Sequence, residues 1–486
     1  MEFSLILPEI LIALTLAFVL IGEITYHGEK MRLISATAVT GLAGAFLQTL
    51  IAYRYGSIRV FGGTLSIDGF SLFFELLFIA LAALSIITSV HHQEIPEERW
   101  TEYCALILAS CLAMCLAAAS TDLLLSFISL QFINGMGYFL AGYGKRSILS
   151  TEAAVKYLLF GSVAGAMLLY GVAILFASTH SLDIYAIHAG LLSSPLSKQV
   201  TGVIFILVFL AFGFQLGAFP MYFWTPDVLE GAPTPASAFL SFGSRAVGFA
   251  VVTRFLIVVF AQPALAQGEW QILGSVDWTR IVAFVSGVTM VLGALLALRQ
   301  DRAKRLVGYL VVAQTGYFLM GLLVLDQVGV AALLYNLIIE LFTLIGIFYV
   351  LSFFQDELQS DRFADLKGLL GRAVPESICL MLFLVSLVGV PPMPGFIGKF
   401  TLIGAAIRHQ WPFLAMLAIG SMSVSTVAVA RLSYSLVGDF KKEVLHPFAP
   451  DPSRRLFLLG LMIPLALAGF FAQFVLEWAG KSLGFN

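Results

Sequence analysis

Apolar stretches long enough to cross a lipid bilayer recur along the whole of this 486-residue chain. A membrane-spanning helix needs about 20 mostly apolar residues. Charged residues make up only 12% of the chain, against about 25% in soluble domains. The sequence therefore excludes a water-soluble protein and predicts an all-α polytopic membrane protein of about 14 transmembrane helices, at 4–22, 32–53, 70–90, 103–119, 122–142, 154–178, 202–224, 236–260, 281–298, 306–325, 330–353, 376–407, 412–437 and 456–478.

The composition also excludes several kinds of function. The formal net charge of −2 provides no basic surface for nucleic acid. The first apolar stretch lacks the basic start and the cleavage site of a signal peptide, so we expect it to remain as the first span. No CxxC pair occurs, and neither a disulfide framework, an iron–sulfur cluster nor another metal site is predicted from the four cysteines, which lie in apolar stretches: Cys104, Cys111, Cys115 and Cys379.

The positions of Lys and Arg predict the orientation of the chain in the membrane. Loops after odd-numbered helices carry 16 of the 27 basic residues, whereas loops after even-numbered helices and the C-terminus carry 6. Cytoplasmic loops are enriched in these residues. We therefore expect a multi-pass protein of a bacterial inner (plasma) membrane, with both termini on the periplasmic side.

The connection between the second and third spans has a pattern of its own. Between residues 54 and 69, Gly62, Gly63 and Gly69 stand among alternating apolar residues. Such a pattern is typical of a β-hairpin. We expect a short hairpin on the face of the membrane.

The remaining basic residues fall within predicted spans, where each would cost about 2.5–3.5 kcal/mol at the bilayer centre on insertion scales. They are Lys156, Arg245, Arg254, Lys399 and Arg431. Lys156 follows Glu152 by one helical turn, which predicts an ion pair. Arg254 and Arg431 either extend to the membrane interface or face a polar interior. Arg245 and Lys399 have no such simple explanation.

Two spans contain helix breakers near their middle. Pro220 interrupts the seventh span, and we expect Pro226 to end it. Pro391, Pro392 and Pro394 follow one another closely in the twelfth span. Because proline removes a backbone donor and clashes with the preceding turn, local unwinding is predicted at both sites. Unwound backbone at this depth is tolerated where it is buried in protein or lines a wet cavity.

The two breaks lie five spans apart, as in transporters built from inverted repeats around a path near the membrane midplane. We predict antiporter-like repeats made of helices 4–8 and 9–13, although ordinary proline kinks are the alternative. The corresponding units are residues 1–102, 103–260, 281–437 and 438–486. The first unit holds three helices and the hairpin, and the last holds the fourteenth helix.

Titratable residues near the second break suggest a proton relay. Lys399 follows this break, and burial and a nearby carboxylate act in opposite directions on the pKa of a lysine. Glu340, near the middle of the eleventh span, is the main acidic candidate, and Glu75 is the second. Titratable groups within a membrane are what such a relay requires. The alternative for Glu340 is a structural carboxylate that contacts a neighbouring subunit.

Four segments resemble one family. The most specific is YFWTPDVLEGAPTPASAFLSFGSRAVGFAVVTRFL at 222–256, and the others lie at 150–171, 301–321 and 389–400. They resemble subunit N (chain 2 in the mitochondrial naming) of proton-translocating NADH:quinone oxidoreductase, the respiratory complex I. The resemblance implies a translocase subunit that has no redox centre of its own. It also implies partner subunits that carry FMN, iron–sulfur clusters and quinone, and it implies M-, K- and J-like subunits as partners within the membrane.

The resemblance maps the family's polar axis onto Lys156, Arg245 and Lys399. This chain departs from the pattern, because Gln131 replaces a glutamate in helix 5, Gln215 replaces a lysine in helix 7, and Arg245 replaces a lysine in helix 8. The first two changes turn an acid–base pair into two amides. Glutamine does not exchange a proton in the physiological pH range, and arginine stays protonated. The path in the N-terminal half is therefore not expected in its usual form.

Three functions stay open at this point. Protons could cross through Lys399 and Glu340 in an energy-converting oxidoreductase. The chain could instead belong to a cation/proton antiporter. It could also be a structural subunit that does not pump, including one of a related complex that uses ferredoxin or a deazaflavin.

Overall fold

The computed structural model describes residues 5–25, 30–90, 92, 94–145, 147–194, 196–264, 269–273, 277–438 and 452–483. Three of the basic loop residues counted above, Arg146, Lys441 and Lys442, lie outside these ranges, as does Ser4, the predicted start of the first span.

Helices long and apolar enough to cross a membrane dominate the structure. Within the described residues there are 13: α2 (Leu7–Thr25), α3 (Lys30–Ala52), α4 (Gly69–Ser89), α5 (Trp100–Ala119), α6 (Leu123–Ala141), α7 (Ile148–Thr179), α9 (Lys198–Leu216), α11 (Thr234–Phe260), α12 (Trp278–Leu298), α13 (Ala303–Leu323), α14 (Gln327–Leu358), α17 (Pro412–Val437) and α18 (Pro452–Phe470). The predicted twelfth span is divided between α15 (Val374–Val388) and α16 (Pro394–Arg408). The predicted all-α membrane fold is confirmed.

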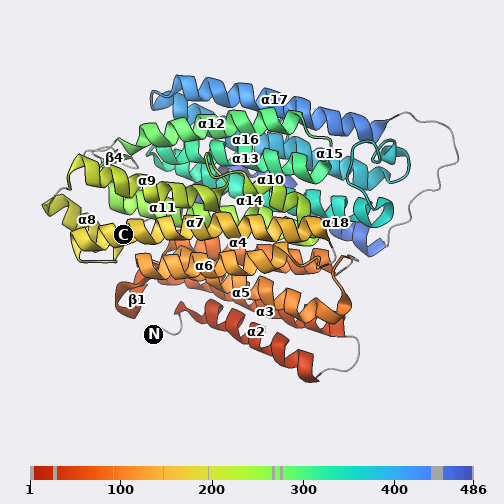
Figure 1. Cartoon of the computed structure of the whole chain (residues 1–486), viewed down its shortest axis with the longest axis horizontal. Coiled ribbons are helices and arrows are strands. Elements are labelled where there is room, and N and C mark those ends of the chain that lie inside the picture. Colours follow the sequence, from red (N-terminus) through yellow and green to blue (C-terminus); the bar gives the residue numbers. More distant parts are fainter. Residues whose placement is uncertain are drawn as a thin grey trace.

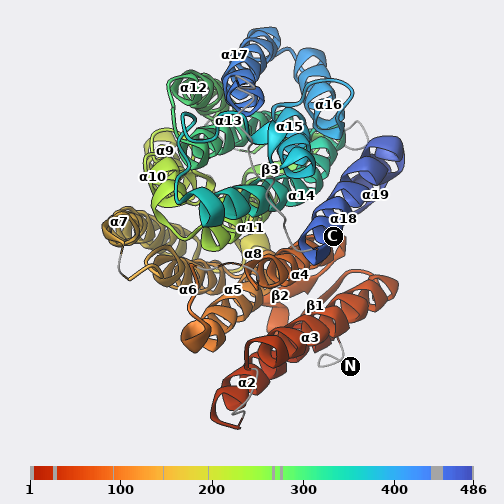
Figure 2. The same cartoon turned by 90° about the vertical axis from the view of Figure 1, so that its right-hand side faces the viewer.

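The helices run side by side in one bundle, with α2 and α3 at one edge and α17 at the opposite edge (Figures 1 and 2). The edge helices expose much of their apolar surface, whereas α11, α13 and α14 are almost entirely buried. Charged side chains are expensive next to lipid and are found facing the interior of membrane bundles. The three inner helices therefore provide the environment in which a polar path could be built.

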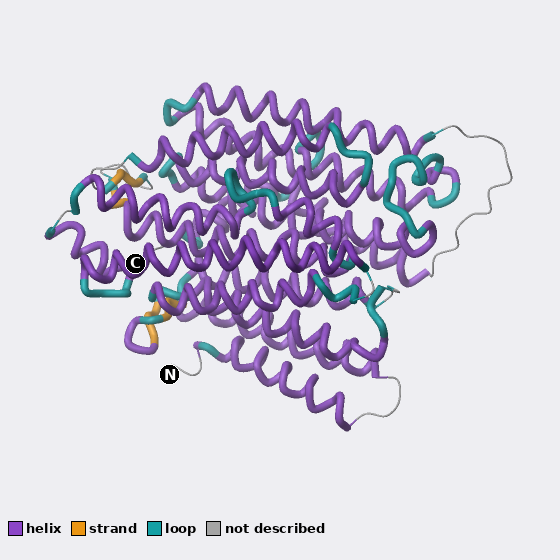
Figure 3. Tube along the Cα trace, in the orientation of Figure 1, coloured by secondary structure: helices purple, strands orange, loops and turns teal. Residues whose placement is uncertain are grey.

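Acidic residues begin several helices at one end of the bundle. Asp68, Asp122, Asp183 and Asp326 accept backbone hydrogen bonds from the first turns of α4, α6, α8 (Ile184–Ser193) and α14. These caps satisfy donors that have no partner within the helix. Two short β-hairpins lie at the same end, in orange in Figure 3. The hairpin of β1 (Ile58–Val60) and β2 (Leu65–Ile67) was predicted and is confirmed; that of β3 (Ala261–Pro263) and β4 (Trp270–Ile272) was not.

Several predicted helix limits differ from the structure. The seventh span does not reach residue 224, because α9 ends at Leu216. Pro226 does not end a helix but lies within α10 (Trp224–Gly231). A proline is tolerated there because the first-turn N–H groups of a helix have no intrahelical acceptor. The predicted span 456–478 is divided at Phe471 between α18 and α19 (Ala472–Lys481).

Arg254, near the C-terminal end of α11, does not extend into solvent. Its guanidinium is buried and donates to both carboxylate oxygens of Asp68, at 2.7 and 2.9 Å. Burial alone would raise the pKa of Asp68, but the charge and hydrogen bonds of Arg254 outweigh burial and hold that pKa below its usual value. By contrast, Arg431 stays partly exposed and pairs with Asp301 at 3.0 Å.

Candidate functional site

Two helices end in the interior of the bundle, and each is followed by a glycine whose backbone has the left-handed conformation. α9 ends at Leu216 and is followed by Gly217 (φ 67°), and α15 ends at Val388 and is followed by Gly389 (φ 87°). Glycine adopts this conformation without the strain that a Cβ would bring. The chain then resumes as α10 and as α16. We call residues 198–231 segment 7 and residues 374–408 segment 12.

The prolines predicted to break these segments lie around the two glycines. Pro220 lies in the non-helical stretch between α9 and α10. Pro391 and Pro392 lie in the stretch between α15 and α16, and Pro394 is the first residue of α16. That position suits proline, since its missing N–H would have no acceptor within the helix.

Lys399, on the second turn of α16, folds back toward the end of α15. Its Nζ donates to the carbonyl oxygens of Leu387 at 3.0 Å and Val388 at 2.6 Å, and it lies 4.4 Å from the centre of the Tyr317 ring. The carbonyl end of a helix carries a partial negative charge, and an aromatic face attracts a cation. The buried ammonium is thus held by neutral groups.

Arg245 and Glu340 form an ion pair in the interior of the bundle. Arg245 Nη2 lies 2.8 Å from Glu340 Oε1, and the guanidinium also donates to the carbonyls of Ser241 and Val311 at 2.9 and 3.2 Å. Glu340 is only 4% exposed, so its alternative role as a contact with a neighbouring subunit is wrong. Its Oε2 is buried and accepts no hydrogen bond from a described residue. A charge without donors is costly in such a place, and protonation removes that cost.

Glu340 and Lys399 are neighbours but not direct partners. In the described structure they form no salt bridge, although each lies within electrostatic range of the other. Helix α13 connects the two: its backbone accepts a hydrogen bond from Arg245, and its Gln314 donates to the Leu387 carbonyl that also binds Lys399. The interior therefore holds one fixed ion pair beside one separate lysine.

The two glutamines lie in different surroundings. Gln215 Nε2 donates to the carbonyl and the hydroxyl oxygen of Ser244, at 3.2 and 3.1 Å, and so lies next to the Arg245 position. The Gln131 amide lies against Gly165 of α7, where an added Cβ would stand 2.0 Å from its Nε2. No hydrogen bond joins the two amides in the described part of the chain. The two amides that replace the family's acid–base pair therefore have separate partners.

Lys156 belongs to a separate network near the end of the bundle. It pairs with Glu152 at 2.7 Å, as predicted, and with Asp227 of α10 at 2.6 Å. Asp227 also pairs with Arg305 at 3.1 Å, which in turn reaches Glu230 at 2.6 Å. The Lys156 side chain is 38% exposed, so the structure does not bring it to the interior ion pair.

Sequence reasoning missed several polar neighbours. Tyr317 lies one turn from Gln314 on the same face of α13, and this spacing could have identified it. Ser244, Asp227 and Glu230 all stand within the motif at 222–256. Glu75 lies apart and accepts a 2.8 Å hydrogen bond from Thr49. Among the residues that the structure describes, no group of three or more His, Cys, Asp or Glu could hold a metal ion.

Comparison with known proteins gives a consistent result. Residues 120–425 match the family described as NADH:quinone oxidoreductase/Mrp antiporter, transmembrane. NADH-quinone oxidoreductase subunit N 2 of Chloroherpeton thalassium is 36% identical over 88% of this chain and 83% of its own length. Subunit N 1 of Solibacter usitatus is 32% identical over 98% of this chain and 96% of its own length.

A solved structure shows the same fold. A chain of respiratory complex I from Thermus thermophilus superimposes with a TM-score of 0.80 and 26% identity, covering 97% of this chain and 99% of that one. The buried Arg245, Glu340 and Lys399 side chains thus lie in a fold shared with a complex I membrane subunit. The chain belongs to the NADH:quinone oxidoreductase/Mrp antiporter transmembrane family, and within that family it is similar to subunit N.

Proposed function

We propose that this chain is the subunit N of a proton-translocating NADH:quinone oxidoreductase and that Lys399 is its proton carrier. The observation that carries the proposal is the position of Lys399, buried beside an ion pair but bound only by two carbonyls and an aromatic ring. An ammonium held by neutral groups can lose its proton without leaving a carboxylate unpaired. The subunit then contributes proton translocation to an oxidoreductase that transfers electrons from NADH to quinone.

The neighbouring residues have different roles in this proposal. Arg245 supplies the fixed positive charge of a guanidinium. Oε1 of Glu340 pairs with Arg245, and the positive charge of Lys399 also acts on the carboxylate. Its Oε2, which accepts no hydrogen bond from a described residue, can take up a proton. Gln215 and Gln131 order polar groups without carrying protons. Lys156 acts at the surface of the bundle, through its pairs with Glu152 and Asp227.

The wider assembly follows from the same proposal. Residues 103–260 and 281–437 form two repeats, flanked by units at 1–102 and 438–486. Both termini face the periplasm of a bacterial cell, since the loops at the opposite end carry most of the Lys and Arg residues. FMN, iron–sulfur clusters and quinone are bound by partner subunits, and M-, K- and J-like subunits are the membrane partners.

Two experiments test this function. Purification of the tagged chain from its membrane is expected to co-isolate flavin and iron–sulfur subunits; isolation with antiporter subunits alone would favour a cation/proton antiporter. In sealed vesicles that contain the whole complex, Lys399→Ala is expected to lower the proton-to-electron ratio. Lys399→Arg is expected to lower it as well, because arginine does not release its proton.

Lys198→Ala provides the control, because Lys198 is exposed at the start of α9. Its ratio is expected to match that of the unmodified complex. An unchanged ratio in Lys399→Ala would contradict the carrier role and favour a structural subunit that does not pump.

A further inference from the structure

The first helices of the chain bury two carboxylates that the proposed proton carrier does not use. α2 packs against α3 and α5, and α4 packs against the same two helices (Figure 2). Glu9 of α2 is 5% exposed, and Glu75 of α4 is 4% exposed. We call these two residues the carboxylate pair. They lie inside a group of apolar helices, where acidic side chains are exceptional.

Groups from all four helices surround the carboxylate pair. Thr49 of α3 donates to Oε1 of Glu75 at 2.8 Å. The two carboxylates lie within electrostatic range of each other, and the Cys115 thiol of α5 lies within range of both, as Cys111 does of Glu75. Oε2 of Glu9 is buried and has no hydrogen-bond partner among the described residues. The pair therefore forms one polar site in which an oxygen lacks a donor.

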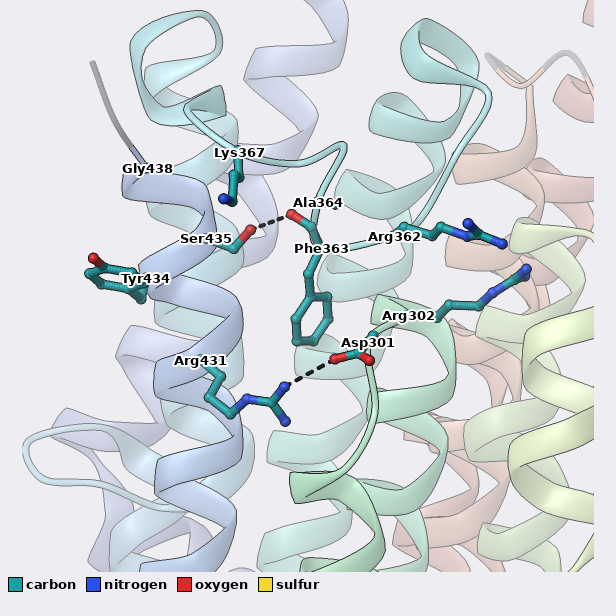
Figure 4. Close-up of a pocket in the computed structure, with 10 residues that line it drawn as sticks. All are labelled: Asp301, Arg302, Arg362, Phe363, Ala364, Lys367, Arg431, Tyr434, Ser435 and Gly438. Carbon is teal, nitrogen blue, oxygen red and sulfur yellow. Dashed lines mark hydrogen bonds and ion pairs between the residues drawn. The ribbon is translucent and has the colours of Figure 1, made fainter. Parts of the chain in front are cut away.

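The carboxylate pair also lacks a counter-ion. Elsewhere in the bundle, the buried Glu340 pairs with Arg245, and even the exposed Asp301 pairs with Arg431 (Figure 4). By contrast, no Lys, Arg or His within the described ranges forms a salt bridge with either member of the pair. The negative charge of an ionised pair would therefore stay unbalanced.

The basic groups on the neighbouring helices lie far away or are already bound. Lys30 and Arg32 lie in the first turn of α3, about 25 Å along the helix from the threonine that donates to the pair. α11 also packs against α4, and its Arg254 is bound to Asp68. The hydroxyl of Tyr53, another titratable neighbour, donates to the Gly69 carbonyl at 3.4 Å. None of these groups neutralises the pair.

Two ionised carboxylates would be strongly unfavourable at this site. A buried charge without a counter-ion is costly, and two carboxylates that share a site resist ionising together. One bound proton removes one of the two charges. It also supplies the hydrogen-bond donor that the free oxygen of Glu9 lacks. The site is therefore suited to hold a proton.

We propose that Glu9 and Glu75 form a second proton-binding site, which holds one proton between the two carboxylates. The ligand is a proton rather than a metal ion, because no group of three or more His, Cys, Asp or Glu in the described part of the chain could hold a metal. Glu75 lies in the second turn of α4, on the side of the β1–β2 hairpin. In the orientation proposed above, the site lies toward the periplasm. It goes beyond the proposed function, since it does not involve Lys399.

Infrared difference spectroscopy of the whole purified complex tests the proposal, because a protonated carboxyl group has a C=O stretching band that a carboxylate lacks. The unmodified complex is expected to lose such a band between neutral and alkaline pH, and Glu9→Gln/Glu75→Gln is expected to lack it. In Glu9→Gln, the band is expected to disappear at a pH lower by about one unit or more, because Glu75 no longer has a negative neighbour.

The matched control is Glu102→Gln, which removes an exposed carboxylate from α5 and is expected to leave the band unchanged. A double variant with the spectrum of the unmodified complex would show that both carboxylates are ionised and would overturn the proposal. An unchanged pH dependence in Glu9→Gln would show that the proton is not shared. Neither result depends on whether Lys399 carries protons.

Labelling with dicyclohexylcarbodiimide, an apolar reagent that attacks protonated carboxyl groups, needs no variant. Peptide mapping of the unmodified complex by mass spectrometry is expected to find the adduct on Glu9 or Glu75 at neutral pH, and less of it at alkaline pH. An excess of sodium chloride is expected to leave the labelling unchanged. Protection by sodium would identify a sodium site instead, and an adduct on neither residue would also contradict the proposal.

Discussion

Segments 7 and 12 break in a similar way but surround their breaks with different chemistry. Near the first break, Trp224 Nε1 donates to the Phe214 carbonyl at 2.9 Å, and the Phe219 N–H donates to the Thr289 hydroxyl at 3.1 Å. All four groups are neutral. Near the second break, the corresponding donor to the helix end is the ammonium of Lys399.

The charges of the two segments also face different environments. α10 directs Asp227 and Glu230 into a partly exposed network with Lys156 and Arg305. α16 places Lys399 in the interior, where it is 2% exposed. A break in the backbone therefore does not by itself make a proton carrier. What distinguishes segment 12 is a buried cation at the break.

The largest expected effect comes from removing the acid beside segment 12. Glu340→Gln leaves the buried Arg245 without a counter-ion, which should lower the free energy of unfolding by about 3–5 kcal/mol. Denaturant titration of the purified chain measures this change. We also expect a lower proton-to-electron ratio in vesicles.

The matched control for Glu340→Gln adds Arg245→Gln. Because the double variant buries no unpaired charge, it is expected to recover most of the lost stability. If the double variant is less stable than Glu340→Gln alone, the two side chains do not interact as a pair.

A somewhat smaller effect is expected from giving segment 7 the cation that it lacks. Gln215→Lys buries a charge at an estimated cost of about 2.5–3.5 kcal/mol. Adding Gln131→Glu should not relieve this cost, since no hydrogen bond joins the Gln131 and Gln215 side chains in the described part of the chain. The changes in the free energy of unfolding of Gln215→Lys and Gln131→Glu, measured by denaturant titration, should therefore sum to that of the double variant to within about 0.5 kcal/mol. A coupling energy above this value would show that the two positions interact.

Apolar patterning and helix breakers predicted most of the fold. The length of an apolar span follows from the thickness of the bilayer, so the limits of α11 and α17 were predicted closely. The position of Pro226 was misjudged because proline stops a helix only where its N–H is needed, and that depends on where the helix begins. The division at Phe471 has no equally clear signal in the sequence.

The pairing within the site could not be predicted in the same way. Sequence identified Arg245, Glu340 and Lys399 individually, because buried charges are exceptional in a membrane. Which of them meet depends on how α11, α14 and α16 pack around α13, and pairing between distant segments leaves no local pattern. The ion pair of Arg254 with Asp68 could not be predicted for the same reason, because the two residues lie far apart in the sequence.

A paired substitution at the two helix ends compares the breaks directly. In Gly389→Ala and Gly217→Ala, the new side chain must adopt a left-handed conformation at an estimated cost of about 1–3 kcal/mol. An added Cβ would stand 2.8 Å from Lys399 Cδ in the first case and 2.6 Å from Thr225 Oγ1 in the second. We expect similar losses of stability in thermal denaturation, but a lower proton-to-electron ratio only in Gly389→Ala. Equal ratios in the two variants would show that moving Lys399 has no effect on pumping.

The smallest expected effects come from two hydroxyl groups of α13. Thr315 donates to the Leu216 carbonyl of segment 7 at 2.8 Å, and Tyr317 donates to the Ala418 carbonyl at 3.0 Å. Thr315→Val and Tyr317→Phe each remove one buried hydrogen bond, which should lower the free energy of unfolding by about 0.5–1.5 kcal/mol. Neither should change the proton-to-electron ratio, because Tyr317→Phe keeps the ring beneath Lys399 and Thr315 lies at the neutral break. If Tyr317→Phe instead lowers the ratio as far as Lys399→Ala does, the phenol hydroxyl itself takes part in proton transfer, and segment 12 depends on more than its lysine.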